Sequence, residues 1–213
     1  MKKNKTIIWL LLAAIMLVFA GCGNNSGTTT SRHSESANNN SGNTQNGTES
    51  NDDKKTLIVY YSYSGTTERV AEHLQKLTNA DIYELELENP YTGDSNEVSD
   101  RVFEERGDGK MPELSGELPD LSEYDRILIG TPVWNADMSN PVASYLEQTD
   151  FGGKTVAPFW TYITDQGSTA KNFVKRCQNA DMADGLAIRS ANGLSDDKLD
   201  EELNDWLQQE IKK

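Results

Sequence analysis

A cluster of small hydroxyl side chains follows the apolar run TLIVYY (56–61). The cluster stands where that run gives way to a helical pattern, and the first N–H groups of a helix have no partners within the helix and favour an anion. Hydroxyls donate hydrogen bonds to phosphate oxygens without adding charge, and a glycine permits close backbone approach. A phosphate site is therefore predicted, although Ser and Thr are also common as simple helix N-caps. The segment YYSYSGTTERVAEHL (60–74) supplies its members: Ser62, Ser64, Gly65, Thr66 and Thr67.

Several classes of phosphate chemistry are excluded by residues that the chain lacks. It has neither the G-x-x-x-x-G-K-[ST] motif of nucleoside triphosphatases nor the G-x-G-x-x-G of dinucleotide-binding domains. The hydroxyl segment contains no cysteine nucleophile, and Tyr60 and Tyr61 stand where a receiver domain would need acids. Cys177 is expected to share one apolar helical face with Phe173 and Val174, which indicates a packed thiol. No pair of cysteines and histidines has metal-ligand spacing, so we predict no metal site and no catalytic residue.

Two other apolar runs end in aromatic residues. Trp134 closes one run, and Trp160 and Tyr162 stand near the end of another. Together with Tyr63 they would form a flat apolar slot beside the phosphate site, although Trp160 fits a core position equally well. A ligand with a phosphate at one end and a flat ring at the other matches FMN.

The elements that must position these residues alternate between strands and helices. Expected strands cover 56–61, 81–88, 126–134, 154–162 and 185–190, and expected helices cover 66–79, 95–106, 140–150, 168–179 and 195–213. This alternation predicts a three-layer, doubly wound α/β domain with a five-stranded parallel sheet, whose ligand binds at the carboxyl ends of the strands. Residues 89–125 form a long polar excursion, and such excursions often have a binding role.

The N-terminal quarter, residues 1–54, is predicted to lie outside the fold. Residues 1–21 combine a basic start with an apolar run, as in a signal peptide, and FAGC resembles a bacterial lipobox that would place a lipid on Cys22. An uncleaved membrane anchor is the alternative. Residues 22–54 contain no aromatic or large aliphatic residue, so they are predicted to be a disordered polar tether with a reach of about 30 Å.

The predicted domain, residues 55–213, would therefore be membrane-anchored at the extracytoplasmic face. The formal net charge of −14 makes nucleic acid an unfavourable partner.

Three segments resemble the flavodoxin-like family, which includes lipid-anchored bacterial members. They are IVYYSYSGTTERVAEHL, DLSEYDRILIGTPVWNADMSNPVASYLE and GKTVAPFWTYITDQGSTAKNF, and the similarity spans about residues 55–190. The resemblance implies a strand order of 2-1-3-4-5 and an FMN cofactor. It implies that the hydroxyl segment holds the phosphate, that the second segment lines the ribityl chain and isoalloxazine, and that the third covers the other ring edge. The residues so implied beyond the hydroxyl segment are Thr131, Pro132, Val133, Trp134, Asn135, Thr161, Tyr162 and the turn up to Gly167.

The chain departs from the family pattern at the ring end. Relatives often carry a second aromatic residue at the position of Asn135, and small glycine-rich residues where this chain has Trp160, Tyr162, Ile163 and Asp165. These departures predict a ring pocket that is bulkier, tighter or shifted.

The leading functional prediction is a membrane-tethered, FMN-binding redox protein. It would act as an electron carrier, or as an oxidoreductase of the NAD(P)H:quinone type with a quinone or partner protein as acceptor. The acidic surroundings are expected to lower the reduction potential of the flavin. The alternative is a flavin-free binding module that recognises a partner protein or polymer at the cell surface.

Overall fold

The computed structural model describes residues 55–211. The predicted signal peptide, the predicted tether and Cys22 fall outside these residues, so their assignments remain predictions. Within 55–211, no helix is both long and apolar enough to cross a membrane. The first strand begins at Thr56, directly after the predicted end of the tether.

A parallel sheet forms the centre of the domain, and its strands run in the order β2–β1–β3–β5–β6, with β7 also paired to β5. The short strand β6 pairs with the start of β5, and β7 pairs with its end, so these two share the fifth position. The predicted doubly wound fold and strand order are confirmed, except that one last strand was expected instead of two. The strands are β1 (Thr56–Tyr60), β2 (Asp81–Glu84), β3 (Arg126–Trp134), β4 (Asp137–Met138), β5 (Thr155–Tyr162), β6 (Asp181–Met182) and β7 (Leu186–Arg189).

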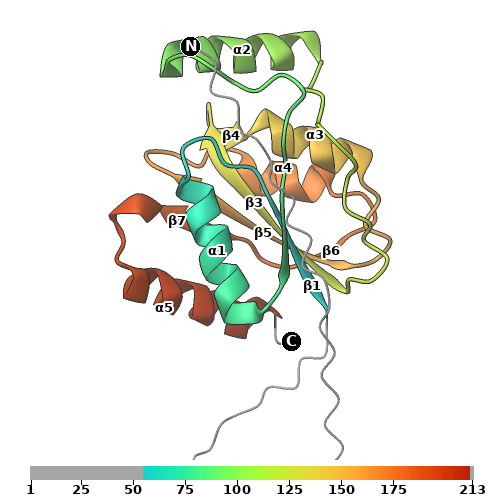
Figure 1. Cartoon of the computed structure of the whole chain (residues 1–213), viewed down its shortest axis with the longest axis vertical. Helices are drawn as coiled ribbons and strands as arrows, with labels where there is room; N and C mark the ends of the chain where they lie inside the picture. The colour runs from blue at the N-terminus through green and yellow to red at the C-terminus, as the bar shows by residue number, and fades with distance from the viewer. Residues whose placement is uncertain (1–54, 212–213) are drawn as a thin grey trace, which may run out of the picture. The chain divides into compact units, whose positions relative to one another are not determined.

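Helices cover both faces of the sheet because successive residues of each central strand are apolar on both sides. In β1, Leu57 and Val59 join the core on one face, and Ile58 and Tyr60 join the core on the other. Figure 1 shows α1 and α5 together on one side of the sheet, and α3 and α4 together on the other. The helices are α1 (Thr66–Thr78), α2 (Ser95–Asp108), α3 (Asn140–Gln148), α4 (Thr169–Arg176) and α5 (Asp196–Trp206), with a 3₁₀ turn η1 (Ala191–Gly193) and a π-helical turn η2 (Leu207–Ile211).

Helix α4 is shorter than the sequence pattern predicted. It ends at Arg176, and its inward face carries Phe173, which is fully buried. Val174 was expected on the same face as Phe173 and Cys177, but its side chain is 64% exposed. The expectation was wrong because adjacent helical residues point about 100° apart, and a helix of two turns has room for only a narrow buried stripe.

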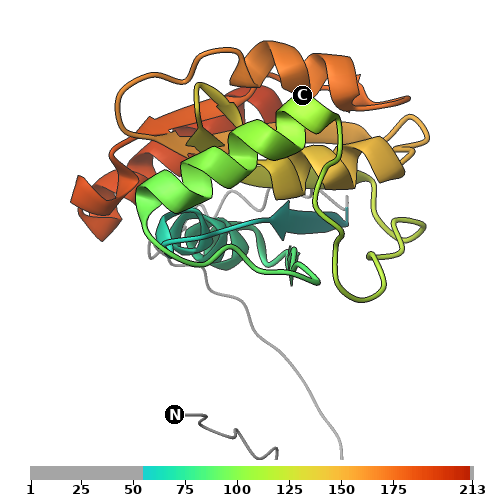
Figure 2. The same cartoon turned by 90° about the horizontal axis from the view of Figure 1, so that it is seen from above.

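The polar excursion between β2 and β3 contains α2, which starts at a capping box. Asp94 accepts hydrogen bonds from the backbone of Asn96 and Glu97, and the Glu97 side chain accepts from the backbone of Asp94. Gly109 ends the helix in a left-handed conformation. Figure 1 shows α2 above the end of the sheet where the parallel strands finish, and Figure 2, which looks onto the domain from above, shows it running alongside α3. The excursion therefore brings a helix to the edge where a ligand is expected.

Candidate functional site

A cavity of about 680 Å³ opens at the carboxyl edge of the sheet. Its walls come from the segments that follow β1, β3, β5 and β7, so four separate strand ends meet around one space. Parallel sheets bind their ligands at this edge, and the volume lies within the usual range for a small-molecule or cofactor site. The predicted residues that line it are Ser64, Thr66, Pro132, Val133, Trp134, Asn135, Thr161 and Tyr162.

Hydroxyl groups gather at the start of α1. Gly65 is the helix N-cap with φ 81°, and this left-handed backbone turns the chain so that Thr66 begins the helix. The hydroxyls of Ser64 and Thr66 lie 3.1 Å apart. The Asn192 amide donates to Thr66 Oγ1 at 2.7 Å and joins the segment after β7 to this cluster. Ser62 does not line the cavity, but its Oγ is buried two residues before Ser64 and has no hydrogen-bond partner among residues 55–211.

Two predicted site residues are buried supports of the cavity wall. Thr67 is 1% exposed, and its hydroxyl lies 2.9 Å from the hydroxyl of Thr161, which ties the first turn of α1 to the end of β5. Thr131 is fully buried, and its hydroxyl lies 3.0 Å from Ser139 Oγ and accepts from the Ser139 backbone N–H. Neither Thr67 nor Thr131 lines the cavity; each fixes a segment that does.

Trp134 forms the aromatic wall at the other end of the site. The rings of Tyr61, Tyr63 and Tyr91 meet it edge-on, with ring centroids 5.6, 5.9 and 5.0 Å from it. Edge-on contacts of this kind stabilise a fixed ring orientation. Trp134 also lines a second cavity of about 260 Å³ beneath α2, which Tyr63 helps to form.

Trp160 belongs to the core. It is 4% exposed, stacks on Phe173 with centroids 6.2 Å apart, and donates from its indole nitrogen to Gln166. From the sequence, Trp160 fitted the core and the ligand slot equally well. The register of β5 in the sheet turns its side chain into the core. Tyr162 is the aromatic residue of β5 that faces the cavity.

A hairpin that the sequence analysis did not predict carries Trp134. Strand β4 pairs back onto the end of β3, and Asn135 and Ala136 form the two-residue turn with φ of 47° and 59°. Such turns need left-handed backbone at both positions. Gly167 has φ 52°, and a Cβ there would lie 2.0 Å from the Ala136 carbonyl oxygen. Gly167 therefore lets the turn after β5 pack directly against the hairpin, and it lies behind the cavity wall.

We expect Ala136→Gly to stabilise the domain by about 0.5–1 kcal/mol, because alanine is strained at positive φ and glycine is not. The midpoint of urea unfolding measures the change. Ala170→Gly, at an exposed position of helix α4, is the matched control and should destabilise by a similar amount. An unchanged or lower midpoint for Ala136→Gly would contradict the expectation.

The fourth wall of the cavity was not predicted from the sequence. It is formed by the segment that follows β7, residues 190–193, together with Ala136. The strand 185–190 was predicted, and the rule that ligands bind at carboxyl ends of parallel strands also applied to the residues after it. The polar run SANG was thus a usable signal, and Asn192 is its member in contact with the hydroxyl cluster.

Charge is scarce around the cavity. Asp165 is the only charged residue among the described residues that line it, and its carboxylate accepts a hydrogen bond from the Gly167 backbone. Burial raises the pKa of the Cys177 thiol to about 12, so this thiol stays protonated and inert at neutral pH. The arrangement offers neutral hydrogen-bond donors at one end and aromatic surface at the other, which suits binding of a ligand that has a polar and a flat apolar end.

Comparisons with known proteins agree with this architecture. Residues 55–210 match the family model described as Flavodoxin. The chain is similar to the crystal structure of a flavoprotein in complex with FMN from Lactobacillus acidophilus NCFM, with 29% identity over 72% of this chain and 98% of that one, and a TM-score of 0.60.

A candidate flavoprotein of Bacteroides uniformis ATCC 8492 is also 29% identical over 71% of this chain and 98% of that one, with a TM-score of 0.63. A search of curated proteins finds no match. Because the family model covers more than half of the chain and the strand order is the one expected, this chain belongs to the flavodoxin family.

Proposed function

We propose that this protein binds FMN and acts in electron transfer at the extracytoplasmic face of a membrane. The observation that carries the proposal is the single cavity that joins the hydroxyl cluster at Ser64 and Thr66 to the aromatic wall at Trp134. The relative from Lactobacillus acidophilus, which was solved with FMN, supports the choice of ligand.

The residues present fit FMN at both of its ends. Ser62 Oγ is buried and has no hydrogen-bond partner among residues 55–211, and such a group is expected to meet a ligand or water. The backbone N–H groups at the start of α1 and the hydroxyls of Ser64 and Thr66 would hold the phosphate. Val133, Trp134 and Tyr162 would line the ring.

Bound FMN supplies the redox chemistry, because it accepts and donates electrons. The chain's own residues bind the phosphate, orient the ring and keep water away from part of it. None of them needs to act as nucleophile, acid or base. Trp134 is held by three tyrosines, so it presents a fixed surface to the ring.

The charge pattern predicts a lowered reduction potential for bound FMN relative to free FMN. Negative surroundings disfavour the negative charge that reduction adds, and Asp165 is the charged residue at the cavity wall. We expect Asp165→Asn to raise the potential slightly, because asparagine still accepts the Gly167 N–H bond but carries no charge. Spectroelectrochemical titration of both proteins tests this, and a potential at or above that of free FMN in the native protein would refute it.

Reconstitution tests the cofactor itself. The full chain, soaked with excess FMN and then desalted, should retain the flavin absorption spectrum in about a 1:1 ratio. A protein that retains no flavin would favour the alternative function, a flavin-free module that binds a partner protein or polymer at the cell surface. The extracytoplasmic location and the altered ring end motivate that alternative.

Turnover separates an electron carrier from a reductase. The 260 Å³ cavity beside Trp134 shows that there is space next to the ring wall. A reductase should oxidise NADH or NADPH with a quinone faster than free FMN does. Rates equal to those of free FMN would exclude the reductase and support the electron carrier.

The lipid anchor is part of the proposal and has its own test. Cys22→Ala should block lipidation and processing, since the thiol is the attachment point. Mass spectrometry of the variant should give the mass of the unprocessed precursor without a diacylglyceryl group. Processing identical to that of the native chain would refute the lipoprotein assignment.

A further inference from the structure

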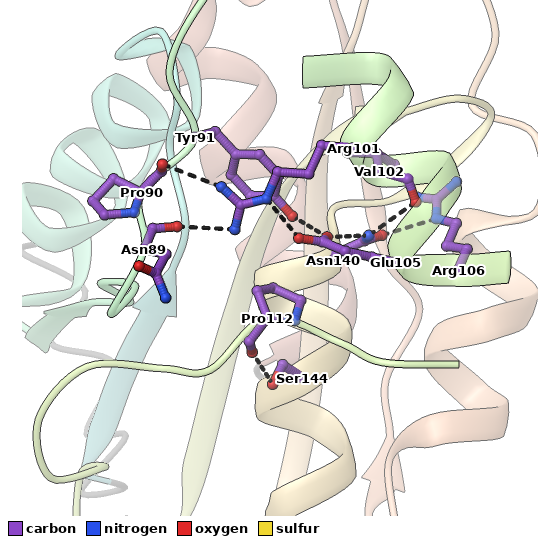
Figure 3. Close-up of polar contacts among 10 residues, drawn as sticks. All are labelled: Asn89, Pro90, Tyr91, Arg101, Val102, Glu105, Arg106, Pro112, Asn140 and Ser144. Atoms are coloured by element: carbon purple, nitrogen blue, oxygen red, sulfur yellow. Dashed lines mark hydrogen bonds and ion pairs between the residues drawn. The ribbon is translucent and has the colours of Figure 1, made fainter. Parts of the chain in front are cut away.

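Arg106, on α2, reaches across to the hairpin that carries Trp134. Its guanidinium donates to the carbonyl oxygens of Trp134 at 3.2 Å, Asn135 at 3.5 Å and Met138 at 2.9 Å. Its Nε donates to Asn140 Oδ1 at 2.8 Å, at the start of α3 (Figure 3). One side chain therefore contacts the β3 end, the turn and the β4 end of the same hairpin.

The pairing within the hairpin is short. Strands β3 and β4 share only two residue pairs, Val133 with Met138 and Trp134 with Asp137. A two-stranded hairpin of this length is not stable alone. Its placement therefore depends on contacts from other elements. From the start of α4, the Ser168 N–H donates to the Ala136 carbonyl at 2.9 Å, and Asn172 donates to the Asp137 carboxylate at 2.7 Å. From α2, Arg106 donates to three backbone carbonyls of the hairpin, including those of Trp134 and Asn135 at the cavity.

A network of side chains around Arg106 fixes it in turn. Asn140 Nδ2 donates to Glu105 Oε2 at 2.8 Å, and Arg101 Nε donates to Glu105 Oε1 at 2.8 Å. Tyr91 donates to the same Glu105 carboxylate, as Figure 3 shows, and its ring packs edge-on against Trp134. Every member has a partner, and satisfied networks of this kind are rigid.

Burial lowers the pKa of the Arg106 guanidinium, while Asp137 opposes the shift. A half-buried cation at a position with three carbonyl acceptors is a specific arrangement, because only arginine spans several acceptors at once with its planar set of donors.

We propose that Arg106 is a positioning residue for the ring end of the FMN site: it sets the place of Trp134 and Asn135, and hence the affinity for the flavin ring. This inference rests on the proposed function.

A second arginine provides a contrast at the phosphate end. Arg69 donates to the carbonyl oxygens of Ala191 at 2.7 Å and Leu194 at 3.1 Å, and so holds the segment that carries Asn192 beside Thr66. Riboflavin has the ring but no phosphate. Loss of the ring wall should therefore weaken FMN and riboflavin alike, whereas loss of the phosphate end should weaken FMN alone.

The experiment measures dissociation constants for FMN and riboflavin by flavin fluorescence, using the full chain. Arg106→Gln should weaken both ligands by the same factor, about 5- to 30-fold, as expected for lost hydrogen bonds to a charged donor. Arg106→Lys should recover only part of the loss, because Arg106 reaches its acceptors with three separate nitrogen atoms and lysine has a single one. Arg69→Gln should weaken FMN and spare riboflavin.

Arg101→Gln is the control for α2 itself. Arg101 anchors the same helix to the carbonyls of Asn89 and Pro90 and donates to Glu105, but it donates to no hairpin carbonyl. Its replacement should weaken both ligands by a smaller factor than Arg106→Gln does, because it reaches the hairpin only through the surrounding network. Hydrogen exchange of the apo-protein gives a readout without flavin: the amides of residues 133–138 should exchange faster in Arg106→Gln than in Arg101→Gln.

The outcomes separate this inference from the proposed function. Native protein that binds neither ligand overturns the proposed function. If the native protein binds FMN, two results for Arg106→Gln would overturn the inference alone. One is unchanged binding of both ligands, and the other is a loss of FMN binding without a loss of riboflavin binding. Equal losses in Arg101→Gln and Arg106→Gln would show that α2 docking in general is responsible, and would overturn it as well.

Discussion

Replacing Thr66 with valine is expected to weaken FMN binding by about 10- to 100-fold and to leave riboflavin binding unchanged, because a hydrogen bond to a charged group contributes about 1.5–3 kcal/mol. Valine keeps the shape of threonine and removes only its hydroxyl, which lies at the first position of α1 and is bonded to Ser64 and Asn192. Titration of both flavins with the full chain measures the two affinities.

The control is the same substitution at the other end of the same helix. Thr78→Val removes a hydroxyl that donates to the Leu74 carbonyl in the last turn of α1, away from the cavity lining. Both flavins should bind this variant as they bind the native protein. If Thr66→Val weakened riboflavin as much as FMN, the hydroxyl cluster would not be the phosphate site.

Gly167→Ala should destabilise the domain by about 2–4 kcal/mol, from backbone strain at positive φ and from overpacking against the hairpin. The new Cβ would lie 2.0 Å from the Ala136 carbonyl oxygen and 2.5 Å from its Cβ, so one backbone must move. In a domain of this size the melting temperature should fall by about 5–15 °C. Because Ala136 adjoins Asn135 at the cavity wall, FMN affinity should fall too.

Gly152→Ala measures how much of this destabilisation comes from backbone strain alone. Gly152 has φ 56°, close to the 52° of Gly167, and its N–H is likewise bonded to an aspartate two residues earlier. No atom lies within 4 Å of a Cβ built at Gly152. Its replacement should therefore cost only about 1 kcal/mol of strain. Equal melting temperatures for the two variants would show that the contact with Ala136 is unimportant.

Local sequence signals predicted most of the fold because they report on burial within one element. The run TLIVY is apolar at every position, and β1 is buried on both faces, as a central parallel strand must be. The glycine and hydroxyls after it marked the turn into α1 correctly. The predictions failed where short strands pair. Strand β4 was not predicted, and β6 and β7 were expected as one strand, because strands this short are defined by the strand they pair with and not by their own periodicity.

In the site, too, local features were predicted and long-range contacts were not. The sequence placed the hydroxyl cluster and Trp134 at strand ends, and the structure puts Ser64, Thr66 and Trp134 around one cavity. It could not distinguish cavity walls from their supports. Thr131 turned out to support the hairpin through Ser139, and Trp160 to pack on Phe173.

By itself, the sequence determined the class of fold, the edge of the sheet where a ligand belongs, and the neutral chemistry of the phosphate end. These follow from residue type and spacing over a few turns of chain. Only the tertiary structure decided that Asn192 meets Thr66 across 126 residues, that Thr67 meets Thr161 across 94, and that Arg106 clamps the hairpin. Such contacts join elements that are distant in the chain, and their geometry follows from how the layers pack, which no local pattern encodes.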